Sequence, residues 1–306
     1  MAVLMIFWDG VGYGKEDSSI NPFFGGSFPT FKKLFDGSIP SLRNRKIFSS
    51  RASVTPVNTT LGVVGLPQSG TGQTAIFTGV NAPKKVGKHF GPYPYSTLIP
   101  IIKERSVFAR LQQRRKSVFF VNGFPKKYFD YINSPRGRTP VVALSYLSAG
   151  RALNTIEDIA AGKALSADFT NEGLNTFGYQ LPVMSTFEAG RRFYEIGRSY
   201  DFTLFEYFLS DKAGHSQKMK SSFDVLQRMD SFLAGILDSF DDRKDILLFV
   251  SDHGNIEDLS TRSHTRNPVP LIVVGSQRNF FCDKIKRLTD ITPAIVSFLS
   301  EGDYRE

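Results

Sequence analysis

Short apolar runs separated by polar and glycine-rich segments dominate the pattern along this chain. Five of the runs are four to eight residues long, which is the usual length of a strand. They are nearly continuous rather than alternating, as is typical of strands buried on both faces of a parallel sheet. We therefore predict strands at residues 3–8, 118–121, 202–209, 246–250 and 271–274.

Helical periodicity lies between and after these runs. Apolar residues recur on one helical face over residues 223–240 and again over residues 291–299. Residues 187–196 predict a third helix. Strands that alternate with helices predict an α/β sandwich with a mostly parallel sheet.

The middle of the chain has a different character. Residues 123–182 are rich in Gly, Pro, Asn and Tyr, and strand-like runs are scarce there. We interpret residues 1–122 and 183–306 as one core domain and residues 123–182 as a small inserted cap, with approximate boundaries.

Composition and charge narrow the class of protein. The 306 residues are 41% hydrophobic and 22% charged, which is ordinary for a globular protein, and no apolar run approaches the roughly 20 residues that span a bilayer. The apolar N-terminus lacks a preceding basic segment and is interrupted by Asp9, so we expect no signal peptide. With Cys282 as the single cysteine, a cytoplasmic location is expected.

The net charge of +9 favours anionic ligands. Basic clusters at residues 43–46 and 114–116 lack interleaved aromatic residues, and no nucleic-acid-binding motif accompanies them. We therefore expect a small anionic ligand rather than nucleic acid or a membrane. The sequence does not indicate the oligomeric state.

Chemically competent side chains follow the predicted strands. Ligands of open α/β sheets bind outside the carboxyl ends of the strands, so several strand ends can supply one site. Any one of these residues could be a helix cap or a surface group, but together they predict a zinc or manganese site, because clustered carboxylates need cations to offset their repulsion. The residues are Asp9, Asp211 with His215 four positions later, Asp252 with His253, and His264 just before the last strand.

A hydroxyl-rich loop precedes an apolar stretch at residues 65–79. Ser69 and Thr71 are both placed near the start of a helix, where free N–H groups favour an anion. The alternative is that these hydroxyls only cap the helix.

The Asp211-x-x-x-His215, Asp252-His-Gly-Asn and His264-Thr motifs resemble the alkaline phosphatase superfamily. The likeness covers about residues 3–79 and 202–299 and is strongest to the branch of cofactor-independent phosphoglycerate mutase and phosphopentomutase. It implies a three-layer α/β sandwich, two divalent metal ions (Mn or Zn), and a serine nucleophile ten residues before Gly79, which is Ser69, with Thr71 as second choice. One metal ion would bind Asp9, Ser69, Asp252 and His253, and the other Asp211, His215 and His264.

The resemblance implies a phosphomonoester hydrolase or phosphomutase that acts through a phospho-serine on a small phosphorylated metabolite. The insertion is too short to supply the residues that hold phosphoglycerate in the long mutases, and the Pro and Arg that follow the nucleophile of sulfatases are missing here. The alternatives are a phosphodiesterase acting on nucleotides and a metal-stabilised binding protein without turnover. Candidate substrate contacts are Lys84, His89, Arg136, Arg138 and Arg151.

Overall fold

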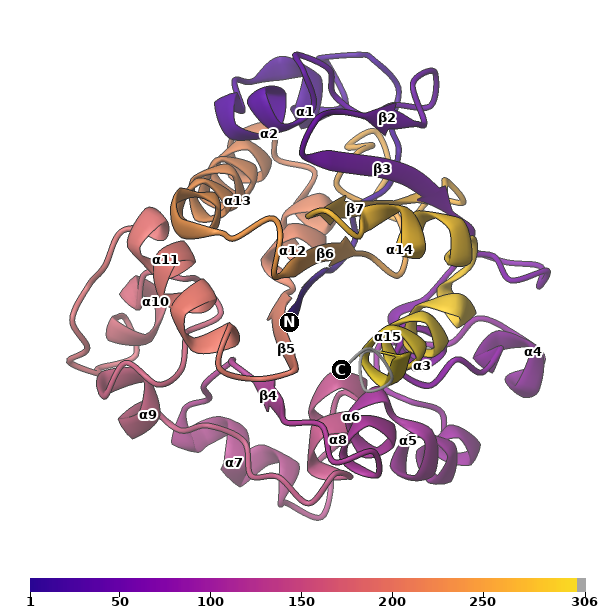
Figure 1. The fold of residues 1–306 in the computed structure, drawn as a ribbon. Coiled ribbons are helices and arrows are strands. Elements are labelled where there is room, and N and C mark those ends of the chain that lie inside the picture. The colour runs from indigo at the N-terminus through magenta and orange to yellow at the C-terminus, as the bar shows by residue number, and fades with distance from the viewer. Residues whose placement is uncertain (302–306) are drawn as a thin grey trace.

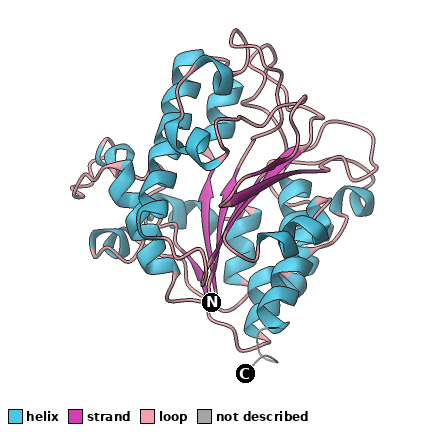
Figure 2. Ribbon diagram, turned by 45° about the horizontal axis from the view of Figure 1, so that its top comes forward, coloured by secondary structure: helices cyan, strands magenta, loops and turns pink. Residues whose placement is uncertain are grey.

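Seven strands form one sheet in the computed structural model, which describes residues 1–301 of the chain. The spatial order is β2-β3-β7-β6-β1-β5-β4, and helices cover both faces (Figures 1 and 2). The strands are β1 (Val3–Trp8), β2 (Ile47–Phe48), β3 (Ala52–Val57), β4 (Val118–Phe120), β5 (Phe202–Tyr207), β6 (Ile246–Val250) and β7 (Val269–Val274).

The predicted mostly parallel sheet is confirmed, with an antiparallel side. β6, β1, β5 and β4 are parallel neighbours. β7 is antiparallel to both β6 and β3, and β2 is antiparallel to β3, so β7 and β2 run against the other strands. The sequence did not predict β2 or β3. Proline is uncommon inside strands, and β3 contains Pro56, which lies opposite Pro270 of β7.

Two predicted strands match the observed bounds, β1 and β6. The prediction for residues 202–209 was too long, because α12 begins at Leu209. The three predicted helices are observed as α11, α13 and α15. The helices are α1 (Pro22–Gly25), α2 (Pro29–Leu34), α3 (Ser69–Thr78), α4 (Ala82–Val86), α5 (Ile99–Arg105), α6 (Val107–Gln112), α7 (Lys126–Ile132), α8 (Val141–Leu147), α9 (Ile156–Ala160), α10 (Glu172–Asn175), α11 (Thr186–Gly197), α12 (Leu209–Ser216), α13 (Met219–Ser239), α14 (Arg278–Lys284) and α15 (Ile291–Glu301), with 3-10 turns at Ser96–Leu98 and Leu288–Asp290.

The two faces of β1 explain why its sequence is apolar throughout. Val3, Met5 and Phe7 belong to a core that includes side chains of α3, α5, α6, α8 and α15. Leu4, Ile6 and Trp8 point to the opposite core, which includes side chains of α2, α11 and α13. Figure 1 shows α11 and α13 on one side of the sheet and α3 and α15 on the other. The central strands are therefore held in place from both faces.

The segment 123–182 carries α7, α8, α9 and α10. Within it, α8 packs against α3, α5 and α6 of the remaining chain. The division into core and cap stays a prediction. Among residues 1–301, no helix has both the length and the apolar character needed to cross a membrane.

Candidate metal and phosphoryl-transfer site

The edge at which β1, β5 and β6 end brings together residues from five segments of the chain. Asp9 follows β1, Asp211 lies in the first turn of α12 after β5, and Asp252 and His253 follow β6. His264 precedes β7 and reaches the same edge because β7 runs antiparallel beside β6. A strand parallel to β6 would have placed His264 at the opposite edge.

Ser69 is the first residue of α3 and points toward this group. Its Oγ lies 3.0 Å from His253 Nε2. Thr71 is turned away, since its fully buried hydroxyl donates to the Gln68 carbonyl at 3.2 Å and accepts from the Phe90 N–H at 3.1 Å. Of the two hydroxyls that the sequence singled out, Ser69 is therefore the one that contacts the histidine.

Asp9, Asp252 and His253 form the first group of metal-ligand type. His253 Nε2 lies 3.6 Å from Asp9 Oδ1 and 3.5 Å from Asp252 Oδ2. Asp252 and His253 are completely buried, and in the described part of the chain no hydrogen-bond donor reaches Asp9 Oδ1 or either oxygen of Asp252. Buried carboxylates without donors are strongly unfavourable, so their chemistry fits a site that a cation completes.

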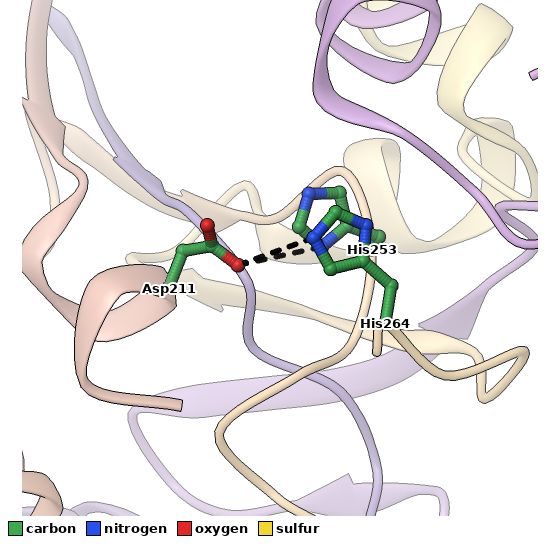
Figure 3. Close-up of side chains that lie close together, drawn as sticks. All are labelled: Asp211, His253 and His264. Atoms are coloured by element: carbon green, nitrogen blue, oxygen red, sulfur yellow. Dashed lines mark ion pairs between the residues drawn. The ribbon is translucent and has the colours of Figure 1, made fainter. Parts of the chain in front are cut away.

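A second group surrounds Asp211. Its Oδ1 lies 3.6 Å from His264 Nε2 and its Oδ2 lies 3.3 Å from His215 Nε2. The two histidine Nε2 atoms are 3.2 Å apart. Figure 3 shows Asp211 facing the rings of His253 and His264, which stack with centroids 3.6 Å apart. Asp211, His253 and His264 also offer ligand atoms that lie close to one another, with His253 Nδ1 4.0 Å from Asp211 Oδ1, so the place of His215 in this group stays a prediction.

Backbone carbonyls fix the orientation of two of these rings. His215 Nδ1 lies 2.7 Å from the Arg262 carbonyl, and His264 Nδ1 lies 2.8 Å from the Pro67 carbonyl. Because a carbonyl only accepts, each Nδ1 must carry the proton, and each Nε2 lone pair faces the Asp211 group. This is the usual arrangement of metal-binding histidines.

Burial sets the protonation of the site. It lowers the pKa of His253 and of His264 to about 4, so both rings are neutral near pH 7 and able to act as ligands. Burial, together with the charges of Asp252 and Asp211, raises the pKa of Asp9 well above its usual value. Burial would also raise the pKa of Asp211, but the neighbouring His215 and His253 hold it below its usual range.

Two glycines allow the close approach of these segments. Gly10 has a positive φ of 70°, and a Cβ there would lie 2.6 Å from Asp211 Oδ1. A Cβ at Gly72 of α3 would lie 3.0 Å from the Cβ of Asp252. Larger residues at either position would push the ligand-bearing segments apart.

A cleft of about 680 Å³ opens beside the site and is lined in part by Asp9, Ser69 and Asp211. Glu206, near the end of β5, lines it too, and sequence reasoning missed this residue. The available signal was a single acidic residue within an otherwise apolar run. The cleft lining includes none of the candidate substrate contacts Lys84, His89, Arg136, Arg138 and Arg151, whose role stays a prediction.

The donor groups at this sheet edge are of the kind that could hold metal ions, and comparison with known proteins agrees with a metal site. Residues 174–301 match the model of the Metalloenzyme superfamily. That range includes Asp211, His215, Asp252, His253 and His264, whereas Asp9 and Ser69 lie outside it. The match and the donor groups together support the use of a divalent metal.

Particular relatives point to one branch. A 2,3-bisphosphoglycerate-independent phosphoglycerate mutase of Antithamnion sp. is 28% identical over 133 residues, covering 40% of this chain and 26% of that protein. Phosphoglycerate mutase of Leishmania mexicana shares the fold with a TM-score of 0.57 at 10% identity, covering 98% of this chain and 95% of that chain. Alkaline phosphatase of the Antarctic bacterium TAB5 gives a TM-score of 0.55 at 13% identity, covering 98% of both chains.

These findings confirm the resemblance to the superfamily and to its phosphoglycerate mutase branch. The matched part corresponds to about a quarter of the length of the curated relatives. Their activities and substrates are therefore not transferred with the fold.

Proposed function

We propose that the protein is a two-metal-dependent phosphoryl-transfer enzyme, a phosphomonoester hydrolase or phosphomutase, that forms a phospho-serine at Ser69 on a small phosphorylated substrate. The observation that carries the proposal is the hydroxyl of Ser69 at 3.0 Å from His253, beside carboxylate oxygens that are buried without donors. The metalloenzyme match and the phosphoglycerate mutase relatives support this class of enzyme.

The distances within each group fit metal coordination. Four donors about 2.1 Å from one ion, arranged as a tetrahedron, lie roughly 3.4 Å from one another. The separations of His253 Nε2 from Ser69, Asp9 and Asp252 are 3.0, 3.6 and 3.5 Å. Around Asp211, Oδ2 lies 3.3 Å from His215 Nε2 and Oδ1 lies 3.6 Å from His264 Nε2, while the two Nε2 atoms are 3.2 Å apart. Mixed imidazole and carboxylate donors suit zinc or manganese.

Divalent cations held by these two groups would favour the ionised serine and offset the negative charge of the phosphoryl group. Ser69 Oγ then bonds to phosphorus as the ester P–O bond breaks, and the departing alkoxide takes a proton from solvent in the cleft. The start of α3 adds the positive end of a helix dipole beside the transferred group. In the second half, the phosphoryl group passes from Ser69 to water in a hydrolase or to a substrate hydroxyl in a mutase.

The test is Ser69→Ala in the metal-loaded protein, with p-nitrophenyl phosphate as substrate. Loss of the nucleophile is expected to lower turnover at least about 1,000-fold, while bound metal, measured by elemental analysis, stays near the wild-type amount. Mass spectrometry of acid-quenched wild-type protein should find phosphate on Ser69. Release of inorganic phosphate would distinguish a hydrolase from a mutase.

Thr71→Val is the matched control, because it removes the neighbouring hydroxyl of the same helix and keeps its volume. It is expected to retain most of the turnover. Full activity of Ser69→Ala, or loss of activity only in Thr71→Val, would contradict the assignment of Ser69.

A further inference from the structure

Beyond the metal-ligand groups, the cleft beside Ser69 has aromatic and apolar walls. Tyr93, Phe124, Tyr128, Leu174, Phe177 and Phe208 all line it. Four of these, Phe124, Tyr128, Leu174 and Phe177, come from the segment 123–182, and the others come from the remaining chain. The two parts of the chain therefore face each other across the cleft.

Two of these rings are left open to solvent. Phe177 is 77% exposed and Phe208 is 41% exposed, although both are large apolar side chains. A single exposed phenylalanine is ordinary, but two that line the same cleft form an apolar surface of the kind that binds ligands. Phe124 and Tyr128 support the wall as a stacked pair with ring centroids 4.3 Å apart.

The charges of the cleft disfavour an anionic organic group. Apart from the proposed metal ligands Asp9 and Asp211, the ionisable acidic and basic side chains among the described lining residues are Asp168, Glu206 and Lys212, so Lys212 is the single basic group. Arg138 lies above the ring of Tyr93, with its Cζ 5.9 Å from the ring centroid, but is not among the lining residues. A second carboxylate or phosphate on the substrate would therefore lose water in the cleft with Lys212 as its single basic partner among the lining residues.

We propose that the cleft selects phosphate monoesters whose organic part is uncharged and aromatic, with the ring packed against Phe177 and Phe208 while the phosphoryl group lies at Ser69. This assignment of a substrate class rests on the proposed function. It also gives the segment 123–182 a role, since that segment supplies one wall of the recognition surface.

A series of alkyl phosphates with similar leaving groups tests the assignment: ethyl phosphate, benzyl phosphate, 2-naphthylmethyl phosphate and 3-phosphoglycerate. On the metal-loaded wild-type protein, kcat/KM is expected to rise about tenfold or more from the ethyl to the benzyl ester, because the ring is removed from water. The value for 3-phosphoglycerate is expected to fall below that for ethyl phosphate.

Variants of the exposed rings test whether these residues cause the preference for the benzyl ester. Phe177→Ala and Phe208→Ala are expected to lower the ratio of benzyl to ethyl kcat/KM several-fold. Phe48→Ala is the matched control, because Phe48 is a 64% exposed phenylalanine of β2 outside the cleft lining, and it should leave both values unchanged. Equal kcat/KM for the ethyl and benzyl esters, or preference for 3-phosphoglycerate, would overturn the assignment and leave the role of Ser69 standing.

Binding of non-hydrolysable phosphonates separates the two proposals if no ester is turned over. Calorimetry on the metal-loaded Ser69→Ala protein should give tighter binding of benzylphosphonate than of ethylphosphonate. If benzylphosphonate binds more tightly but the wild-type protein turns over no ester, the proposed enzyme activity is rejected and the proposed recognition surface is supported. Equal affinities would reject the recognition surface.

Discussion

Glu206 shows how strongly burial can change one side chain at this site. Burial, and then the negative charge of Asp252, raise the pKa of Glu206 to about 8. Its backbone is fixed by Asn122, whose side-chain amide donates to the Glu206 carbonyl and accepts from the Glu206 N–H, each at 2.8 Å. The backbone that carries this carboxyl group is therefore fixed at the cleft, and the carboxyl group is neutral near pH 7 in the metal-free protein.

This pKa predicts a pH-dependent stability. Between about pH 5 and pH 8 the unfolded chain has lost the Glu206 proton and the folded chain still holds it, so this residue makes stability fall as pH rises. Glu206→Gln should reduce that fall by up to about 1.4 kcal/mol per pH unit. Urea unfolding of the chelated protein at pH 5.5, 6.5 and 7.5 measures the difference in slope.

Glu104→Gln serves as the control for this comparison, because Glu104 is an exposed residue of α5. Its unfolding free energy should follow the wild-type pH dependence. If the unfolding free energy of Glu206→Gln also follows the wild-type pH dependence, Glu206 is not held in its neutral form.

At the scale of elements, α11 and α13 pack through glycines. A Cβ at Gly190 of α11 would collide with the Phe232 carbonyl oxygen, and a Cβ at Gly235 of α13 would collide with the Phe187 carbonyl oxygen. Each contact is to backbone, which cannot rotate away. The distance between these helices, which cover one face of the sheet, is therefore set by the absence of side chains at both positions.

Gly235→Ala is expected to destabilise the protein even though alanine is the better helix former by about 1 kcal/mol. Forcing the helices apart should leave a net loss of roughly 1–3 kcal/mol in the free energy of unfolding. Gln227→Ala, at an exposed position of the same helix, should change the free energy of unfolding by less than about 0.5 kcal/mol. A raised denaturation midpoint for Gly235→Ala would contradict the close packing.

At the scale of the whole molecule, the proposed metal-ligand groups join segments that are far apart in the sequence. Asp9 follows β1, Ser69 begins α3, Asp211 lies in α12, Asp252 follows β6 and His264 precedes β7. Burial and mutual repulsion of the carboxylates oppose folding when no cation is bound. Metal binding should therefore stabilise the entire chain rather than one loop.

Chelation is expected to lower the melting temperature, and manganese or zinc at about 100 times its dissociation constant should restore about 2.7 kcal/mol of stability. Asp252→Asn should make the chelated protein more stable than the chelated wild type, because it removes a buried carboxylate, and should lose most of the metal response. Asp224→Asn, at an exposed position of α13, should behave as wild type. Thermal unfolding of the wild-type protein is measured with and without chelator. If the two curves coincide, the proposed metal site is contradicted.

The sequence by itself determined the strands with continuous apolar runs and the type of donor at their ends. β1 and β6 could be predicted to the residue because both of their faces are buried, so every position is apolar. Asp211 and His215 could be paired because helical spacing places them on one side of α12. These features depend on local pattern, which a single sequence carries.

Only the tertiary structure decided the distances and the burial of these donors. His264 reaches this edge of the sheet because β7 pairs antiparallel with both β6 and β3, and these pairings join residues far apart in the sequence. Glu206 and the aromatic walls of the cleft were likewise not predicted, since the pKa of a carboxyl group and the exposure of a ring depend on what surrounds them. Burial and contact are properties of the folded chain, and the order of residues alone does not specify them.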